Sequence, residues 1–301
     1  MESALYVGLC TCTGIVNRRY DAEFRRQHKL SLSILKEFGF GKDIMEERIQ
    51  DEVSVLLQKI RNINSAAFCP DAVFTSCVLN VIVSILFGHR LDDKAVGEIG
   101  KVSHSFMRCA FDAFPVDLFP WLRFLPTLRR ALDAAADVRD KLKRIITSNI
   151  ETSDEDSFVR CYVNREGRKL DEEQLEYTVR DLIIAGTETS ASTLLWSLVL
   201  LAGRDGQSVQ ERMWQEIDSQ VPRDRLPSLA DRPRLPFVEA TILEIMRVRT
   251  IVPLSLRHWT SRDTNVGGYF IPANTMVSNY GGLFCITLSF FAILPVFCCS
   301  Q

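Results

Sequence analysis

One long helical segment dominates the hydrophobic pattern of the chain. Between residues 171 and 203, apolar side chains recur at helical spacing, which gathers them along one helix. They are Leu175, Val179, Leu182, Ala191, Leu194, Leu195, Leu198 and Leu201. Asp171, followed three residues later by Gln174, forms an N-terminal capping box ahead of this run. We therefore predict one long buried helix, Asp171–Gly203.

The centre of this predicted helix breaks the local rules. Gly186 costs a helix about 1 kcal/mol relative to alanine, and Glu188 is a carboxylate in an otherwise almost uncharged run. A membrane-spanning helix over Leu182–Ala202 has the right length, but a carboxylate in mid-span is costly. We favour a core helix that borders a ligand cavity, in which Gly186 permits close approach to the backbone. Glu188 and Thr189 can relay protons there.

The rest of the pattern predicts further helices and, near the end, short strands. We expect helices over residues 18–36, 43–63, 71–87, 128–150, 158–163, 209–220 and 236–248. Strands are expected at 253–261 and 266–271, with turns at 262–265, 267–268 and 272–274. The segment Phe114–Pro126 contains three prolines and several aromatic residues, so we predict an apolar loop that contacts either neighbouring elements, a membrane or an entering ligand. The predicted class is mostly α with a small β-sheet.

Composition narrows the kind of partner. The 301 residues are 47% hydrophobic and 25% charged, as in an ordinary globular protein with a large core. A net charge of −2 argues against general nucleic-acid binding. The nine cysteines form no metal-ligand cluster with each other or with histidine, so no metal site is predicted. An odd number of cysteines without a signal peptide is typical of a reducing cytosolic environment.

Four motifs in order carry a family resemblance. AGTETS (Ala185–Ser190) is similar to the oxygen-binding motif of the cytochrome P450 superfamily, the haem-thiolate monooxygenases. Glu244 and Arg247 match its Glu-x-x-Arg helix, although by themselves they are most simply a solvent-exposed pair. Pro253–His258 and the turn-rich stretch after it resemble the following sheet segment, and the proline-rich loop resembles the entry-channel loop of microsomal members. The resemblance runs from about residue 18 to residue 279 and implies a cytochrome P450 fold that is incomplete.

The resemblance assigns roles to the central helix. It implies that Thr189 hydrogen-bonds dioxygen at the haem and that Glu188 feeds protons toward it. Ala185 and Gly186 would be small because oxygen and substrate must fit between the helix and the haem. These four residues are the expected catalytic and cofactor-binding positions of the helix.

Downstream positions receive roles in the same way. Glu244 and Arg247 would be a buried pair that supports the proximal side of the haem. His258, with Arg257 beside it, would contact a haem propionate. Val252 and Leu254 would line the apolar substrate pocket.

The sequence also departs from the family pattern. Aligning residues 38–41, FGFG, places Phe24 and His28 where the family has a haem-contacting Trp and Arg, with Arg25 or Arg26 as substitutes. The family's proximal loop, Phe-x-x-Gly-x-x-x-Cys-x-Gly, has no counterpart here. None of the late cysteines (Cys285, Cys298 and Cys299) has the required neighbours. The N-terminal membrane anchor and first strands are not found either. We accordingly expect a partial domain over residues 1–279 and an unrelated hydrophobic tail over residues 280–301.

Two questions stay open from the sequence. The apolar run Leu283–Cys299 is either a read-through or alternative final segment, which we favour, or a tail anchor. By resemblance the protein oxidises a lipophilic small molecule, takes electrons from a flavoprotein reductase and resides on the cytosolic face of the endoplasmic reticulum membrane. The alternative is a truncated, non-catalytic form that acts as a binding or interaction protein.

Overall fold

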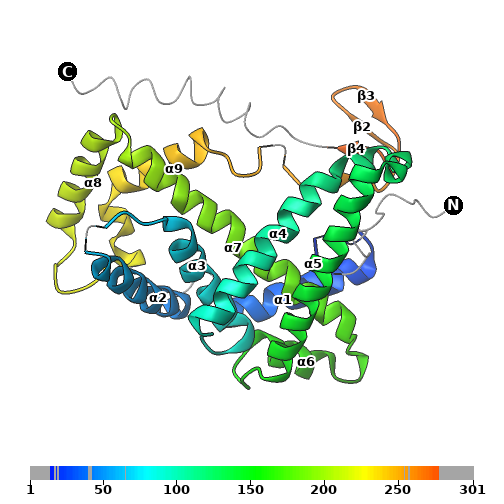
Figure 1. Ribbon diagram of the computed structural model, residues 1–301, viewed down its shortest axis with the longest axis horizontal. Helices are drawn as coiled ribbons and strands as arrows, with labels where there is room; N and C mark the ends of the chain where they lie inside the picture. The colour runs from blue at the N-terminus through cyan, green and yellow to red at the C-terminus, as the bar shows by residue number, and fades with distance from the viewer. Residues whose placement is uncertain are drawn as a thin grey trace. The chain divides into compact units, whose positions relative to one another are not determined.

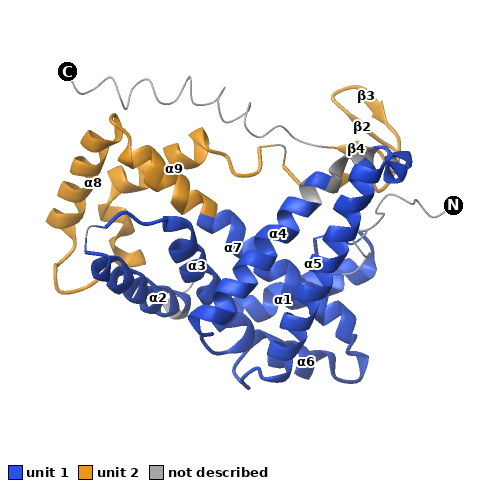
Figure 2. Ribbon diagram, in the orientation of Figure 1, with its two compact units in different colours: residues 1–191 blue, residues 192–301 orange. Residues whose placement is uncertain are grey.

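The computed structural model describes residues 14–16, 18, 20–39, 43–64, 66–253, 255–256 and 258–277. They belong to two compact units, residues 1–191 and residues 192–301, coloured separately in Figure 2. Most of the described residues are in α-helices and the strands are short, which confirms the mostly-α class (Figure 1). Three predicted features lie outside the described residues: Arg257, Leu254 and the hydrophobic tail 280–301.

The first unit consists of helices. They are α1 (Ala22–Glu37), α2 (Asp43–Asn62), α3 (Pro70–Phe87), α4 (Asp93–Leu118), η1 (Pro120–Phe124), α5 (Pro126–Glu151), α6 (Phe158–Glu166), η2 (Gly167–Lys169) and the greater part of α7 (Glu172–Ala202). Every helix predicted for this part of the chain is present, with ends that differ from the prediction by at most four residues. The structure adds α4, which packs along α5 (Figure 1).

Side chains of the sequence mark the helix ends. Asp21 Oδ1 accepts a hydrogen bond from the backbone N–H of Phe24 at 2.6 Å, which starts α1. Asp171 Oδ1 accepts the N–H of Gln174 at 3.1 Å, which is half of the predicted capping box. The Gln174 side chain is used elsewhere, because its Oε1 accepts the N–H of Gly14 and an N–H of Arg18. This glutamine thus ties the N-terminal segment to α7 instead of closing the box.

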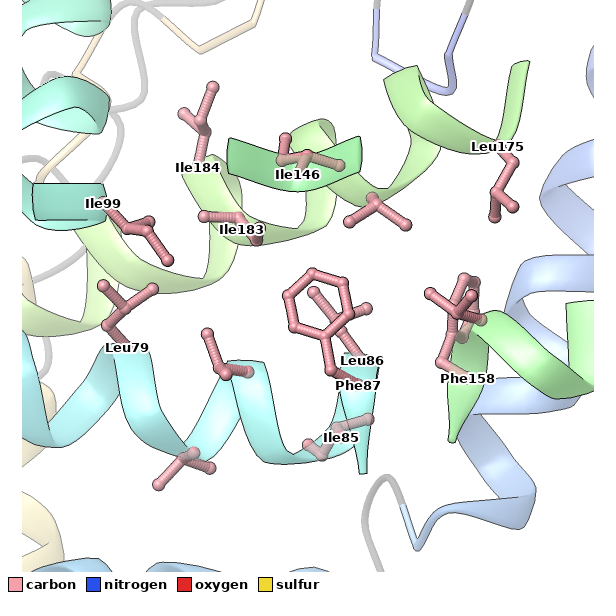
Figure 3. Packing of buried hydrophobic residues seen from close by; sticks show 14 of the residues in the cluster. Leu79, Ile85, Leu86, Phe87, Ile99, Ile146, Phe158, Leu175, Ile183 and Ile184 are labelled. Atoms are coloured by element: carbon pink, nitrogen blue, oxygen red, sulfur yellow. The ribbon is translucent and has the colours of Figure 1, made fainter. Parts of the chain in front are cut away.

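An apolar cluster fills the first unit (Figure 3). Leu79, Leu86 and Phe87 of α3 face Ile183 of α7, and Phe158 of α6 closes one end. Their side chains are no more than 1% exposed, and burying each contributes about 1.5–3 kcal/mol. The first half of α7 is therefore a core helix, as predicted. The prediction that the whole helix is buried was wrong, since Leu194 and Leu198 of its second half are exposed.

The proline-rich segment 114–126 is more helical than predicted. Helix α4 continues through Pro115 to Leu118, Pro120 begins η1, and Pro126 begins α5. The expectation that three prolines exclude regular helix was wrong, since a proline at the first helical position gives up an N–H that would have no helical partner anyway. Pro115 costs α4 one internal hydrogen bond, and the helix continues for three more residues.

Two helices of the described residues could cross a membrane by length and composition, Pro70–Phe87 and Glu172–Ala202. The core helix of a soluble protein can have the same length and composition. In the most apolar 18 residues of each helix, 39% of the first and 22% of the second are buried in the protein. Both helices supply core side chains in Figure 3.

The described residues of the second unit form the end of α7, three more helical segments and four short strands. They are α8 (Gly206–Gln220), η3 (Leu229–Arg234), α9 (Pro236–Val248), β1 (His258–Trp259), β2 (Thr264–Val266), β3 (Tyr269–Ile271) and β4 (Met276–Val277). Strands β2 and β3 form an antiparallel hairpin around Gly267 and Gly268, where a turn was predicted. The prediction of one strand over 266–271 after a turn at 262–265 was wrong, because β2 begins within that predicted turn and the two glycines separate it from β3.

The strand predicted over residues 253–261 was wrong in extent. Among the described residues of this segment, only His258 and Trp259 are paired as a strand, and β4 is their antiparallel partner. Ser255 interrupts the segment, since its φ of 57° lies in the left-handed region and its N–H bonds the carbonyl of Val252. The result is two separate two-stranded sheets among the described residues.

Candidate functional site on helix α7

The middle of α7 presents an exposed face of small side chains. Ala185 and Thr189 lie one turn apart on this face and both are exposed. The Thr189 hydroxyl donates a hydrogen bond to the carbonyl oxygen of Ala185 at 2.7 Å, a back-bond that hydroxyl residues commonly form in helices. The hydroxyl oxygen keeps acceptor capacity beyond this bond. A small polar group is thus presented beside a side chain no larger than a methyl group.

Gly186 faces a different neighbour. A Cβ added to it would lie 2.8 Å from Cδ1 and 3.1 Å from Cγ1 of Ile82 on α3, closer than such atoms normally approach. The absence of a side chain therefore has a packing reason in this structure. Its predicted role beside a haem stays a prediction.

Glu188 points toward α4. Its Oε2 lies 3.7 Å from Nδ1 of His104, an ion-pair distance when the imidazole is protonated. The Glu188 side chain is 22% exposed and that of His104 is 75% exposed. The carboxylate is therefore partly enclosed and contacts a group that solvent reaches freely.

Glu244 and Arg247 of α9 form the predicted pair. Arg247 Nε donates to Oε2 of Glu244 at 2.7 Å and Nη2 donates to Oε1 at 2.6 Å. The two side chains are 28% and 25% exposed, so this pair is less solvated than a simple surface pair. Such a bidentate geometry is among the stronger charge-assisted hydrogen bonds.

Two further predicted positions lie in the second unit. Val252 is 42% exposed, between α9 and β1. His258 is exposed on β1, in register with Val277 of β4. Neither side chain is in the described apolar core.

The predicted positions on α1 are exposed. The His28 ring stacks on Phe24 with ring centroids 5.5 Å apart, and the Arg25 guanidinium lies 5.9 Å from the Tyr20 ring centroid. Arg26, the other basic candidate, is engaged by acidic residues. Its guanidinium holds the pKa of Glu23 at about 2, mainly by hydrogen bonding, and also binds Glu166.

The structure brings some predicted residues together and adds others. Glu188 and Thr189 are neighbours on α7 but face different surroundings. Sequence reasoning missed His104, whose only signal was a histidine in an unassigned segment. It also missed the structural role of Asp181, whose Oδ2 accepts the N–H groups of Ile15 and Val16 at 2.9 and 3.0 Å.

Comparison with known proteins identifies the family. The sequence model of the cytochrome P450 family matches residues 10–282. Cytochrome P450 2U1 of Homo sapiens is 32% identical over 281 residues, which are 88% of this chain and 51% of that protein. Cytochrome P450 2H1 of Gallus gallus is 33% identical, over 88% of this chain and 56% of that protein. The chain belongs to the cytochrome P450 family.

The fold agrees with this assignment. A zebrafish cytochrome P450 solved with progesterone superimposes with a TM-score of 0.77 over 90% of this chain and 65% of that chain, at 21% identity. The fold is therefore that of a cytochrome P450, and an incomplete one. The chain spans about half the length of the curated relatives named above. Membership of this family implies a haem cofactor.

Proposed function

We propose that the protein is a haem-dependent monooxygenase that oxidises a lipophilic small molecule with dioxygen and electrons from a flavoprotein reductase. In this proposal residues 1–279 form the cytochrome P450 part, and residues 280–301 are a separate hydrophobic tail. The proposed location, by resemblance to microsomal members, is the cytosolic face of the endoplasmic reticulum membrane.

The observation that carries the proposal is the arrangement of α7 around Thr189. Ala185 and Thr189 leave an exposed face without a large side chain, which fits a flat cofactor lying close to the helix. Haem, when bound, supplies the oxygen activation that protein side chains cannot. The chain's own contribution on this side is the Thr189 hydroxyl and the Glu188 carboxylate one residue before it.

The two side chains have separable tasks. The Thr189 hydroxyl donates a hydrogen bond to the carbonyl oxygen of Ala185, so in this orientation it can offer a ligand only its oxygen as an acceptor. It becomes a donor to a ligand only when the hydroxyl rotates. Glu188 lies beside His104 of α4 and can carry a proton toward the turn of α7 that contains Thr189. Val252 and Leu254 are proposed to line the substrate pocket, and His258, Arg257, Arg25 and His28 to contact the haem propionates. Glu244 and Arg247 are proposed to support the proximal side.

The test substitutes alanine for Thr189 in a haem-loaded form of the protein that also carries the family's proximal cysteine loop. Alanine keeps helix propensity, so haem binding, checked by the ferrous–CO spectrum, should be retained. Product formed per reductant oxidised should fall by on the order of tenfold or more, because a positioned proton-transfer group contributes about 10²–10⁴-fold to its step. Glu188→Gln should lower the same ratio, since it keeps the shape but removes the ionisable group.

Thr193→Ala is the matched control. Thr193 lies one turn further along α7, so this change also removes a hydroxyl from the helix. It should leave the ratio of product to reductant near the wild-type value. If Thr189→Ala and Glu188→Gln behave like Thr193→Ala, the AGTETS segment is a packing feature and the proposed catalytic roles are withdrawn.

A further inference from the structure

Among the described residues, Glu188 has one close neighbour of a kind that can exchange protons near neutral pH. His104 projects from α4 with its Nδ1 3.7 Å from Glu188 Oε2. This distance is longer than a hydrogen bond of about 2.7–3.2 Å, so the groups attract when the imidazole is protonated and need a small side-chain rotation to bond. The outer position of His104, with three quarters of its side chain exposed, makes that rotation easy.

Few other ionisable side chains lie near Glu188 and His104 on α7 and α3. Between Leu182 and Gly203, the sequence of α7 has no ionisable side chain except Glu188. In α3, the sequence from residue 72 to residue 88 has one ionisable side chain, the thiol of Cys77. Lys101 and Arg108 lie about one turn before and after His104 on α4.

Helix α5, which also packs on α4, carries charges of both signs. Its acidic and basic residues are Arg129, Arg130, Asp133, Asp137, Arg139, Asp140, Lys141, Lys143, Arg144 and Glu151. In the structure Arg139 pairs with Asp140, and Lys143 pairs with Glu176 of α7. Among the described residues, none of these charges forms an ion pair with Glu188 or His104.

We propose that His104 is a positioning residue that holds Glu188 and exchanges protons between this carboxylate and solvent. The inference rests on the proposed function of Glu188. In the step we infer, the imidazolium gives its Nδ1 proton to Glu188 Oε2 and becomes neutral, and it then recovers a proton from solvent. No electron is transferred and no other reactant is needed.

The geometry gives His104 both properties that this role requires. A relay group must reach the carboxylate and also reach solvent, and His104 does both because Glu188 is largely enclosed and His104 is not. Histidine is also the side chain that changes charge between about pH 5 and 8. A lysine at this position would attract Glu188 at all these pH values and would exchange protons less readily.

The first measurement uses the 301-residue chain itself. His104→Gln, Glu188→Gln and the double variant form a cycle whose unfolding equilibria give the interaction between the two side chains. We expect an interaction of several-fold in the unfolding equilibrium constant when the imidazole is protonated and close to none when it is neutral, because only the protonated imidazole attracts the carboxylate. A cycle with no interaction at either pH overturns the inference.

The second measurement uses the haem-loaded protein and a matched control. His104→Gln should change the pH dependence of product formed per reductant oxidised and increase the loss of rate in D₂O, whereas Lys101→Gln should do neither. Lys101 is an exposed charge on the same helix that has no part in the site. A His104→Gln variant with a wild-type pH profile and isotope effect overturns the relay even if the cycle shows an interaction.

The outcomes separate this inference from the proposed function. If Glu188→Gln and Thr189→Ala leave coupling unchanged, the proposed catalytic roles of Glu188 and Thr189 fail and this inference fails with them. If both lower coupling while His104→Gln and Lys101→Gln do not, the proposed function holds and only the role of His104 is wrong.

Discussion

At the scale of single residues, Asp231 shows how a fully buried carboxylate is kept ionised. Its side chain accepts hydrogen bonds from Arg225 at 2.6 and 2.8 Å, from the N–H and hydroxyl of Ser228, and from Arg234. Burial alone favours the neutral acid. The hydrogen bonds, first those from Arg225 and then that from the Ser228 backbone, outweigh burial and hold the pKa of Asp231 far below its ordinary value.

This depressed pKa predicts an acid-dependent stability. A carboxyl whose pKa is lower in the folded state stabilises the protein above its unfolded value of about 3.9, and the contribution is lost as the pH falls below that value. Asp231→Asn should therefore lower the melting temperature at pH 7 and flatten its decline between about pH 5 and 2. Asp224→Asn, which changes an exposed acidic residue in the same connecting segment, is the matched control. Equal slopes for wild type and Asp231→Asn would contradict the argument.

Residue pairs differed in how far the sequence could predict them. Glu244 and Arg247 lie three positions apart on one helix, so their contact follows from helical geometry alone. Glu188 and His104 are on different helices, and their contact depends on how α4 and α7 cross, which no local pattern specifies. The charge of Glu188 identified half of the candidate site, and the fold was needed for the other half.

At the scale of elements, glycines decide how closely helices approach. Gly186 packs against the Ile82 side chain of α3, whereas a Cβ on Gly206 would lie 2.3 Å from the carbonyl oxygen of Leu201. An isoleucine side chain can move, but the backbone at the end of α7 cannot do so cheaply. Gly97, in the interior of α4, has nothing within 4 Å of its added Cβ.

These three glycines predict an ordered series of stabilities. Gly97→Ala should stabilise the protein by up to about 1 kcal/mol, the helix-propensity difference. Gly186→Val should destabilise it by about 1–3 kcal/mol through overpacking, and Ile82→Ala should reduce that penalty. Gly206→Ala should destabilise without rescue by any side-chain truncation. Urea unfolding of each variant measures the series, and a stabilising Gly206→Ala would be incompatible with it.

Elements with strong periodicity were predicted well, and those set by tertiary contacts were not. Residues 236–248 of α9 match the prediction end to end because Pro236 starts the helix and the apolar spacing continues to Val248. Helix α4 was missed although Val96, Ile99 and Phe106 are buried at helical spacing, and Pro115 suggested a loop. Strand β4 was missed because two residues carry no recognisable alternation, and its pairing with β1 defines it.

At the scale of the whole molecule, the two units have unequal cores. Every residue of the main apolar cluster lies between Ile34 and Ile184, within the first unit. Among the described residues of the second unit, the buried large apolar side chains are Val221, Leu235 and Ile245. Many apolar side chains of this unit are instead exposed, including Val199, Leu243 and Met246 at 60%, 60% and 50%. The hydrophobic free energy that resists unfolding is therefore concentrated in residues 1–191.

This asymmetry predicts unequal protection of backbone amides in the 301-residue chain. Opening free energies in one protein range from near zero up to the global value, and regions with few buried apolar contacts lie at the low end. Amides of α3, whose side chains form the core of the first unit, should exchange orders of magnitude more slowly than those of α9, although both are regular helices. Hydrogen exchange followed by mass spectrometry of peptides from residues 79–87 and 237–248 measures the difference.

Replacing exposed Leu243 with glutamine should leave both exchange rates nearly unchanged, whereas replacing buried Ile245 with alanine should speed exchange in α9 alone. Equal protection of α3 and α9 would show that the second unit is stabilised by contacts other than its own buried side chains.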